Sequence, residues 1–290
     1  MGIRQQVPSV MQPAVRATLL KVGTVTSRWR MDPSFMVIGG QRCGTTTIFK
    51  SLAEHPQVLR PPVDKGTDYY SLYYDRGRSW YRGRMPLAQP SRFRATGRGQ
   101  PQAFEACTYY MFHPLAIERI ARDFPAIKLV AMLRNPVERA YSAYKHEFAR
   151  GFEPEANFRR ALDLEDSRLE GEIERIRQDA SYESIPHRHH AYRHRGQFAE
   201  QLKRVYASFP REQVHVIESE AFFADPGGEY RRLIDFLGLA SWEPAKIEQH
   251  NARPSSPMPE DARSFLANHY QAYDEELADL LGHRPSWTVS

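Results

Sequence analysis

The sequence has few cysteines, no long apolar run and no spacing typical of a zinc site. Cys43 and Cys107 are the only two cysteines in 290 residues, which excludes a disulfide scaffold and favours a reducing compartment. No stretch approaches the roughly 18 apolar residues that a membrane span needs. Pro13, Arg16 and Lys21 interrupt the N-terminal apolar runs, so we expect no secretory signal. These absences together predict a cytoplasmic protein.

The composition bounds the size of the core and the kind of ligand. Hydrophobic residues make up 41% of the chain and aromatic residues 12%, enough for the core of one large α/β domain. Forty Lys and Arg against 35 Asp and Glu give a net charge of +5. This mild excess favours anionic ligands without requiring nucleic acid, and we expect no nucleic-acid partner. Oligomeric state stays open.

Short apolar runs alternate with helical patterns after residue 33, which predicts a mostly parallel sheet. The expected strands are residues 35–38, 102–106, 127–133 and 213–218. The expected helices are residues 45–54, 114–123, 136–150, 198–208 and 230–237. We therefore expect an α/β fold, a central parallel sheet flanked by helices, formed by a single domain over residues 34–290. Residues 1–33 form a leader segment.

Three segments outside this pattern allow two interpretations each. The leader stretch "VRATLLKVGTV" is either a solvated helix or an amphipathic helix that makes peripheral contact with a membrane. Residues 75–101 are rich in arginine and predict an irregular basic loop, either a surface for an anionic acceptor or a solvated one. Residues 153–190 are highly charged and form either a lid or a solvated surface.

The stretch "FMVIGGQRCGTTTIFKSL" predicts a strand, a glycine-rich turn and a helix that begins near Thr45. The spacing Gly39-x-x-x-x-Gly44 fits a nucleoside triphosphate loop, but Thr45 stands where that motif requires lysine. A basic residue occurs earlier, at Arg42. Backbone amides at a helix start bind anions, and the hydroxyls of Thr45, Thr46 and Thr47 add donors. The stretch therefore predicts an anion site that is not built for ATP.

A second stretch, "KLVAMLRNPVERAYSAYKHE", places Arg134 at the end of a strand. Ligands of open α/β sheets bind at this edge. Asn135 suits the N-cap and Pro136 the first turn of the next helix, which carries Ser142. An arginine and a serine so placed suit a second phosphate. The two stretches together predict a ligand with two separated anionic groups.

The pair "GGQRCGTT" and "LRNPVERAYSAY" resembles the sulfotransferases that use 3′-phosphoadenosine 5′-phosphosulfate (PAPS), in particular the heparan sulfate N- and O-sulfotransferases and their bacterial relatives. The resemblance implies a P-loop-like sulfotransferase fold, PAPS as donor, adenosine 3′,5′-bisphosphate (PAP) as product, and no metal. It implies that the 5′-phosphosulfate is bound by Arg42, Gly44, Thr45, Thr46 and Thr47. We interpret Cys43, inside this loop, as a small residue that contacts the ligand through its amide and not through a reactive thiolate. It implies that Arg134 and Ser142 bind the 3′-phosphate.

The similarity extends over roughly residues 34–287. The segments at 105–120, 209–239 and 251–282 resemble, in turn, the family's region between the two motifs, its late strand and helix, and its C-terminal cofactor loop. Within the last segment, the resemblance implies that Asn251 and Arg253 approach the cofactor.

The acceptor side departs from the family pattern. The family has Lys-Glu followed by aromatic residues, and its glutamate removes the acceptor proton. Here the run is "DKGTDYYS", with Gly66 at the glutamate position. Asp68 is the nearest carboxylate, and Glu105 and His113 are further candidates for the base. The residues expected to bind the acceptor are Lys65, Tyr69, Tyr70 and His113.

The resemblance implies transfer of a sulfuryl group to a hydroxyl or amine of a small-molecule, lipid or glycan acceptor. Two alternatives remain: a P-loop kinase, which the missing lysine disfavours, and an inactive nucleotide-binding homologue, which Gly66 favours. The histidines at 187, 189, 190 and 194 do not lie on one helix face, so we interpret them as loop residues near the acceptor and expect no metal site.

Overall fold

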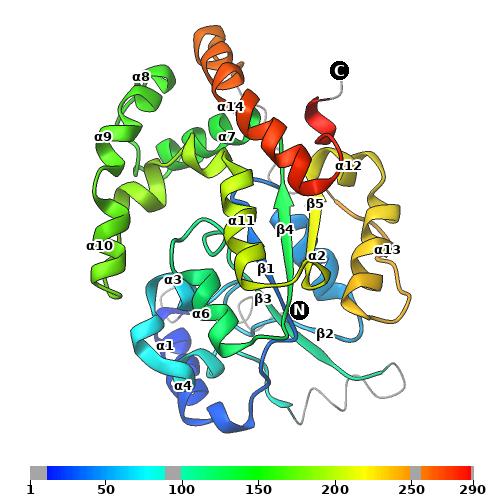
Figure 1. Cartoon of the computed structure of the whole chain (residues 1–290). Coiled ribbons are helices and arrows are strands. Elements are labelled where there is room, and N and C mark those ends of the chain that lie inside the picture. Colours follow the sequence, from blue (N-terminus) through cyan, green and yellow to red (C-terminus); the bar gives the residue numbers. More distant parts are fainter. Residues whose placement is uncertain (1–11, 89–98, 249–255, 289–290) are drawn as a thin grey trace.

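The computed structural model describes residues 12–88, 99–248 and 256–288, with the side chains of residues 12–15 excepted. Its centre is a five-stranded sheet in which every pair is parallel, in the order β2-β3-β1-β4-β5 (Figure 1). The strands are β1 (Phe35–Gly39), β2 (Val58–Leu59), β3 (Gln102–Ala106), β4 (Lys128–Leu133) and β5 (Val214–Glu218). From central β1 the chain runs to β2 and β3 on one side and then crosses to β4 and β5 on the other, which places a topological switch point between the carboxyl ends of β1 and β4.

Burial on both faces explains why the strands are continuous apolar runs. All five residues of β1 are buried, as are five of the six in β4. Val37 is aligned with Ala106 of β3 and with Val130 of β4. Parallel strands covered by helices on both faces require such runs, and the predicted parallel sheet is confirmed.

Helices cover the sheet on both faces (Figure 1). Their bounds are α1 Gln12–Val25, α2 Thr45–Glu54, α3 Tyr69–Leu72, α4 Gly77–Arg82, α6 Ala116–Asp123, α7 Pro136–Ala149, α8 Phe158–Asp163, α9 Glu165–Leu169, α10 Glu172–Gln178, α11 Phe198–Ser208, α12 Ser219–Ala224, α13 Pro226–Leu237 and α14 Glu260–Leu281. One core surrounds the sheet, and a second joins α7, α8 and α14. Within the described residues no helix is long and apolar enough to cross a membrane.

The elements expected from the sequence occur with small shifts at their ends. The four predicted strands and five predicted helices are all present. The helix expected to start at residue 230 begins at Pro226, because Asp225 caps it through the backbone amide of Gly228. Strand β2 was not expected from the sequence, because its two residues are too few for a periodic signal.

Over residues 75–88, which the structure describes, the basic segment is not an irregular loop that faces an acceptor. It contains α4, and its arginines bind the leader: Arg82 forms an ion pair with Asp32, and Arg84 donates to the hydroxyl of Thr24. Gly23 of α1 packs directly against Gly83, where an added Cβ would lie 2.2 Å from the Gly83 carbonyl oxygen. The described part of the leader is therefore docked on the domain. Arg92, Arg94 and Arg98 lie outside the described residues.

The charged segment at 153–190 is folded as α8, α9 and α10 and is held by buried ion pairs. Glu153 is buried and accepts from Arg168 at 2.8 Å. His187 and His189 are buried and hydrogen-bonded to Tyr109 and Glu147. These two histidines are thus fixed parts of the fold rather than loose loop residues.

Candidate functional site

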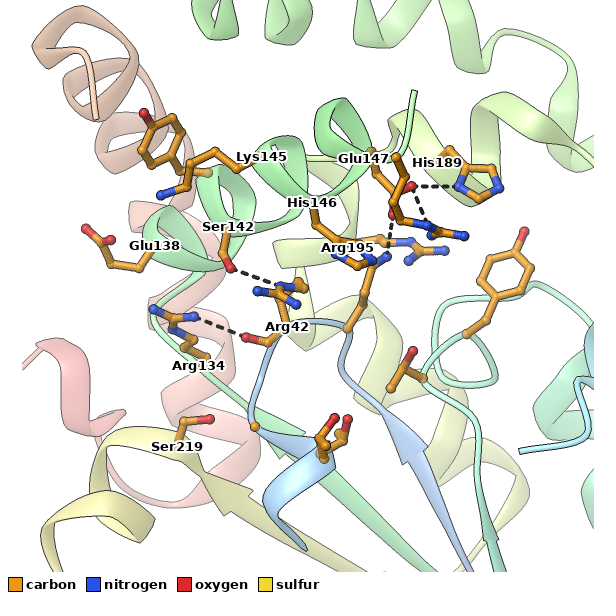
Figure 2. Close-up of a pocket in the computed structure, with 18 of the residues that line it drawn as sticks. Arg42, Arg134, Glu138, Ser142, Lys145, His146, Glu147, His189, Arg195 and Ser219 are labelled. Carbon is orange, nitrogen blue, oxygen red and sulfur yellow. Dashed lines mark hydrogen bonds and ion pairs between the residues drawn. The ribbon is translucent and has the colours of Figure 1, made fainter. Parts of the chain in front are cut away.

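A cavity of about 1180 Å³ opens at the carboxyl ends of β1 and β4 (Figure 2). Its walls come from the β1–α2 loop, from α7, and from the segments around residues 65–68, 108–109, 188–195 and 256–263. Eight Lys and Arg line it against four Asp and Glu. A cavity with this excess of positive charge favours an anionic ligand.

The β1–α2 loop and α7 meet directly. The Arg42 Nε donates to the Ser142 Oγ at 3.0 Å, and the Arg134 Nη1 donates to the Arg42 carbonyl oxygen at 3.2 Å (Figure 2). The Asn135 side chain accepts from Val137 and Glu138, which fixes the start of α7. The two predicted anion-binding stretches, some ninety residues apart in the chain, therefore form one continuous surface.

Two residues of the cavity have a backbone conformation that side chains rarely adopt. Arg42 has φ 67° and Asp68 has φ 52°. They are the two non-glycine residues with positive φ in the part of the chain that the structure describes, and both line the cavity. Such strain gathers at functional sites, where the surrounding structure holds it.

The threonines at the start of α2 do not share one role. Thr45 and Thr46 line the cavity, and Gly44, at φ 84°, lets the chain turn into the helix in front of them. Thr47 is buried, and its hydroxyl donates to the Glu248 carbonyl oxygen at 3.2 Å. Thr47 is therefore directed away from the cavity, in contrast to the expectation.

Cys43 also does not face the cavity. Its side chain is fully buried, and its backbone amide donates to the Gly40 carbonyl oxygen at 3.3 Å within the loop. Burial raises the pKa of the thiol to about 12, so it is not a thiolate. Cys43 fills space beneath the loop, and the expectation of a ligand contact through its amide is not met.

Lys65 lies against the anion loop rather than among acceptor-binding residues. Its Nζ donates to the Thr45 Oγ1 at 3.0 Å, and it lines the cavity. Burial lowers the pKa of this ammonium to about 8. The structure thus adds a second cation beside Arg42, which the spacing in the sequence did not reveal.

Asp68 is the carboxylate beside this loop. The Cys107 thiol donates to its Oδ1 at 2.9 Å, and the Arg188 Nη2 lies 3.8 Å from its Oδ2. Its side chain is 36% exposed, so it can reach a ligand in the cavity. Among the three candidates for the base, Asp68 is the one that lines the cavity.

Gly66 packs too closely for any side chain. A Cβ there would lie 2.4 Å from the carbonyl oxygen of Ala106, and the neighbouring Lys65 carbonyl oxygen accepts from the Ala106 amide at 3.0 Å. A glutamate at this position would require the backbone to move, so the departure from the family pattern is built into the local packing.

Besides Thr47 and Cys43, four further expected site residues do not line the cavity. Glu105 is fully buried and accepts from the Thr67 amide and the Tyr81 hydroxyl. Tyr69 and Tyr70 are buried in an aromatic cluster with Tyr81. Packing on β3 and α3 gives them structural roles, and this corrects the interpretation of Glu105 as a base and of both tyrosines as acceptor contacts.

His113 is the fourth of these residues. It is 2% exposed, its Nδ1 accepts from the Leu115 amide, and burial lowers its pKa to about 3. It does not line the cavity, so neither a base nor an acceptor contact is supported there.

The side of the cavity near α7 and α14 carries a second group of residues. Glu138 pairs with Arg263 at 2.8 Å, and the Lys145 Nζ lies 4.0 Å from the ring centroid of Tyr141. Residues 256–258 close this side. The expected cofactor residues Asn251 and Arg253 lie outside the described residues.

The opposite side of the cavity carries a hydrogen-bonded group around Glu147 that was not expected from the sequence. Glu147 is 1% exposed and accepts from Gln41 at 3.1 Å and Arg150 at 3.4 Å, and lies 2.9 Å from the His189 Nδ1. Glu147 lies on α7, and no local signal in the sequence marks it. Over the described ranges, no three His, Cys, Asp or Glu are placed to hold a metal ion.

Comparison with known proteins identifies similar chains. A family model described as "Sulfotransferase domain" matches residues 32–255. Human bifunctional heparan sulfate N-deacetylase/N-sulfotransferase 3 is 26% identical over 88% of this chain, which spans only 31% of that protein. Mouse heparan sulfate glucosamine 3-O-sulfotransferase 6 is 25% identical over 94% of this chain and 78% of its own length. The crystal structure of a sulfotransferase from Alicyclobacillus acidocaldarius is similar with a TM-score of 0.64 and 30% identity, over 87% of this chain and 97% of that one.

Proposed function

This chain belongs to the sulfotransferase domain family, and we propose that it transfers the sulfuryl group of PAPS to a hydroxyl or amine of an acceptor. We choose PAPS as the donor because Arg42 contacts both Ser142 and Arg134. It joins an anion loop without the kinase lysine to a second anion-binding surface. A nucleotide with one phosphate group at each end of its ribose fits such a pair of sites.

In this proposal the positive charges at the β1–α2 loop stabilise the leaving group. Attack of the acceptor oxygen forms a new S–O bond, and the bond from sulfur to the bridging oxygen of the 5′-phosphate breaks. The electron pair of that bond stays on the phosphate, so negative charge develops there. Arg42, Lys65 and Thr45 line the cavity, and the Lys65 Nζ is hydrogen-bonded to the Thr45 Oγ1. These residues would hold the 5′-phosphate, and their fixed positive charge would stabilise the transition state.

The acceptor proton requires a base on the other side of the sulfur. We assign it to Asp68, which lines the cavity, is partly exposed and is oriented by Cys107. A positioned carboxylate typically contributes 10²–10⁴-fold to such a step. The presence of Asp68 weighs against an inactive homologue despite Gly66.

We propose a glycan as the acceptor. The names of the relatives give heparan sulfate as what they act on, and this supports a glycan hydroxyl or amine ahead of a lipid or another small molecule. The buried free thiols of Cys43 and Cys107 fit a reducing compartment, so we propose a cytoplasmic location.

Peripheral membrane contact is a further part of the proposal. Leu19, Val22, Val25 and Trp29 are exposed along α1 and the turn after it, next to Lys21 and Arg28. Apolar side chains flanked by cations suit an anionic lipid surface. Sedimentation with phosphatidylserine vesicles, compared with neutral vesicles, tests this part separately.

Isothermal titration calorimetry in EDTA tests the choice of nucleotide. PAP should bind without a divalent metal and at least a hundredfold more tightly than ATP, because the second anion surface recognises the 3′-phosphate. Comparable affinity for ATP that depends on magnesium would instead support the P-loop kinase.

A further inference from the structure

Residues 65–68 carry the two groups that the proposed reaction needs on either side of the sulfur atom. Lys65 and Asp68 both line the cavity, and the proposed function assigns Lys65 to the leaving phosphate and Asp68 to the acceptor proton. We call these four residues the base segment. Because the two groups are so close in the chain, the backbone of the base segment sets where they lie relative to each other.

The first half of the base segment is fixed to the carboxyl end of β3 by its backbone. The Ala106 amide donates to the Lys65 carbonyl oxygen at 3.0 Å. Gly66 lies so close to β3 that an added Cβ would be 2.4 Å from the Ala106 carbonyl oxygen. This half therefore has no room to move toward the sheet.

The second half is held by side chains, first by that of Glu105. This residue is fully buried, and its Oε2 accepts from the Thr67 amide at 2.8 Å. Its Oε1 accepts from the hydroxyls of Tyr81 at 3.0 Å and Tyr110 at 3.3 Å. A buried hydrogen-bonded network of this kind is rigid when all its members are satisfied. The Thr67 amide, next to Asp68, is therefore held in one place.

Cys107 holds the side chain of Asp68. It is 4% exposed, directly follows β3, and donates from its thiol to the Asp68 Oδ1 at 2.9 Å. Asp68 has φ 52°, and its carbonyl oxygen accepts from the Leu72 amide at 2.8 Å. Such a backbone conformation costs free energy and persists only where the surroundings hold it. The position of this carboxylate is thus imposed by its neighbours.

We propose that Glu105 and Cys107 are positioning residues of the transfer reaction, which hold the base segment so that Asp68 meets the acceptor on the far side of the sulfur from Lys65. Neither side chain lines the cavity, so both act through the base segment and not on a reactant. Misplacing a catalytic group by about 1 Å can cost roughly a hundredfold in rate. The inference rests on the proposed function and adds two residues that the reaction needs without contact to a substrate.

Cys107→Ala and Cys107→Ser separate the hydrogen bond from the rest of the side chain. The full-length protein is assayed for transfer of labelled sulfate from PAPS to N-desulfated heparan sulfate, a glycan with free hydroxyls and amines. Cys107→Ala should lower kcat at least tenfold, because Asp68 loses its donor, while KM for PAPS and the dissociation constant of PAP change less than twofold. Cys107→Ser keeps a donor and should stay within threefold of wild type.

A double variant tests whether Cys107 acts through Asp68. In the Asp68→Asn background no base is left to position, so adding Cys107→Ala should lower kcat by less than twofold. Residues that act through one another give such non-additive effects, whereas independent effects multiply. A further tenfold loss in the double variant would show that Cys107 acts elsewhere and would overturn its assignment.

Glu105 is tested by a second pair of variants. Glu105→Gln keeps an oxygen for the Thr67 amide and should retain kcat within fivefold, whereas Glu105→Met removes the acceptor and should lower kcat at least tenfold at unchanged PAP affinity. Loss of PAP binding in Glu105→Met would show that Glu105 is needed for folding and would overturn its assignment. Tyr70→Phe is the matched control, because it removes a buried hydrogen bond of 3.2 Å to Asp123 on α6, and it should change kcat less than twofold.

The outcomes distinguish this inference from the proposed function. Wild-type transfer with an undiminished kcat in Cys107→Ala, or an equal loss in Cys107→Ala and Cys107→Ser, contradicts the inference alone. A loss in Tyr70→Phe as large as that in Cys107→Ala would indicate general weakening of the core instead of positioning. A wild-type protein that transfers no sulfate to this glycan would contradict the proposed function, and the inference with it.

Discussion

At the scale of single residues, Asp68 decides whether this cavity can activate an acceptor. Asp68→Asn keeps an oxygen for the Cys107 thiol but removes basicity. We expect sulfuryl transfer to fall at least a hundredfold while PAP affinity stays unchanged, because a positioned general base contributes about 10²–10⁴-fold. Labelled-sulfate transfer and calorimetry measure the two quantities. Asp75→Asn, an exposed acid outside the cavity, is the control, and activity within a few-fold of wild type would assign the base elsewhere.

Lys65 predicts a pH dependence. Its pKa is lowered to about 8 by burial, so the free enzyme carries the ammonium below pH 8 and loses it above. If donor binding and leaving-group stabilisation need this charge, kcat/KM for PAPS should fall as pH rises through about 8, since kcat/KM reports groups of the free enzyme. In Lys65→Arg the guanidinium stays charged, and the fall should disappear. The same fall in both proteins would show that another group titrates.

At the scale of elements, α1 contacts the end of α4 through two glycines, Gly23 and Gly83. Gly23→Ala should release α1 from α4, because the new Cβ would lie 2.2 Å from the Gly83 carbonyl oxygen, although alanine favours a helix by about 1 kcal/mol. Hydrogen exchange of residues 16–31 should quicken while PAP affinity stays the same. In Gly227→Ala on α13 the nearest atom is a flexible arginine end at 3.6 Å, so no loss is expected. Unchanged exchange in Gly23→Ala would show that the backbone adjusts.

At the scale of the whole molecule, the cavity joins distant parts of the chain. Its wall runs from Gln41 to Arg263, and it borders both hydrophobic cores. PAP at a hundred times its dissociation constant should therefore raise the free energy of unfolding by about 2.7 kcal/mol. Urea denaturation followed by tryptophan fluorescence measures this, and adenosine, which has no phosphate, should give no such gain. Stabilisation by adenosine alone would mean that the base, not the phosphates, provides the affinity.

The sequence by itself determined the features that depend on short stretches of chain. The buried strand before Gly39, the helix from Thr45 and the capped helix from Pro136 follow from apolar runs, glycine spacing and N-cap chemistry, and each occurs where expected. The contact of Arg42 with Ser142 was not predicted, because it depends on β1 and β4 being neighbours in the sheet, and the strand order is known only from the structure.

Tertiary structure alone decided which way the acceptor-side residues face. Glu105 and Tyr69 are directed into the core, and Lys65 reaches back to Thr45. Arg195 enters the cavity from a segment about 150 residues beyond the anion loop, without a local motif to mark it. Outside regular periodicity, the direction of a side chain is set by which neighbours leave room for it, as the Ala106 carbonyl against Gly66 illustrates, and those neighbours come together only when the chain has folded.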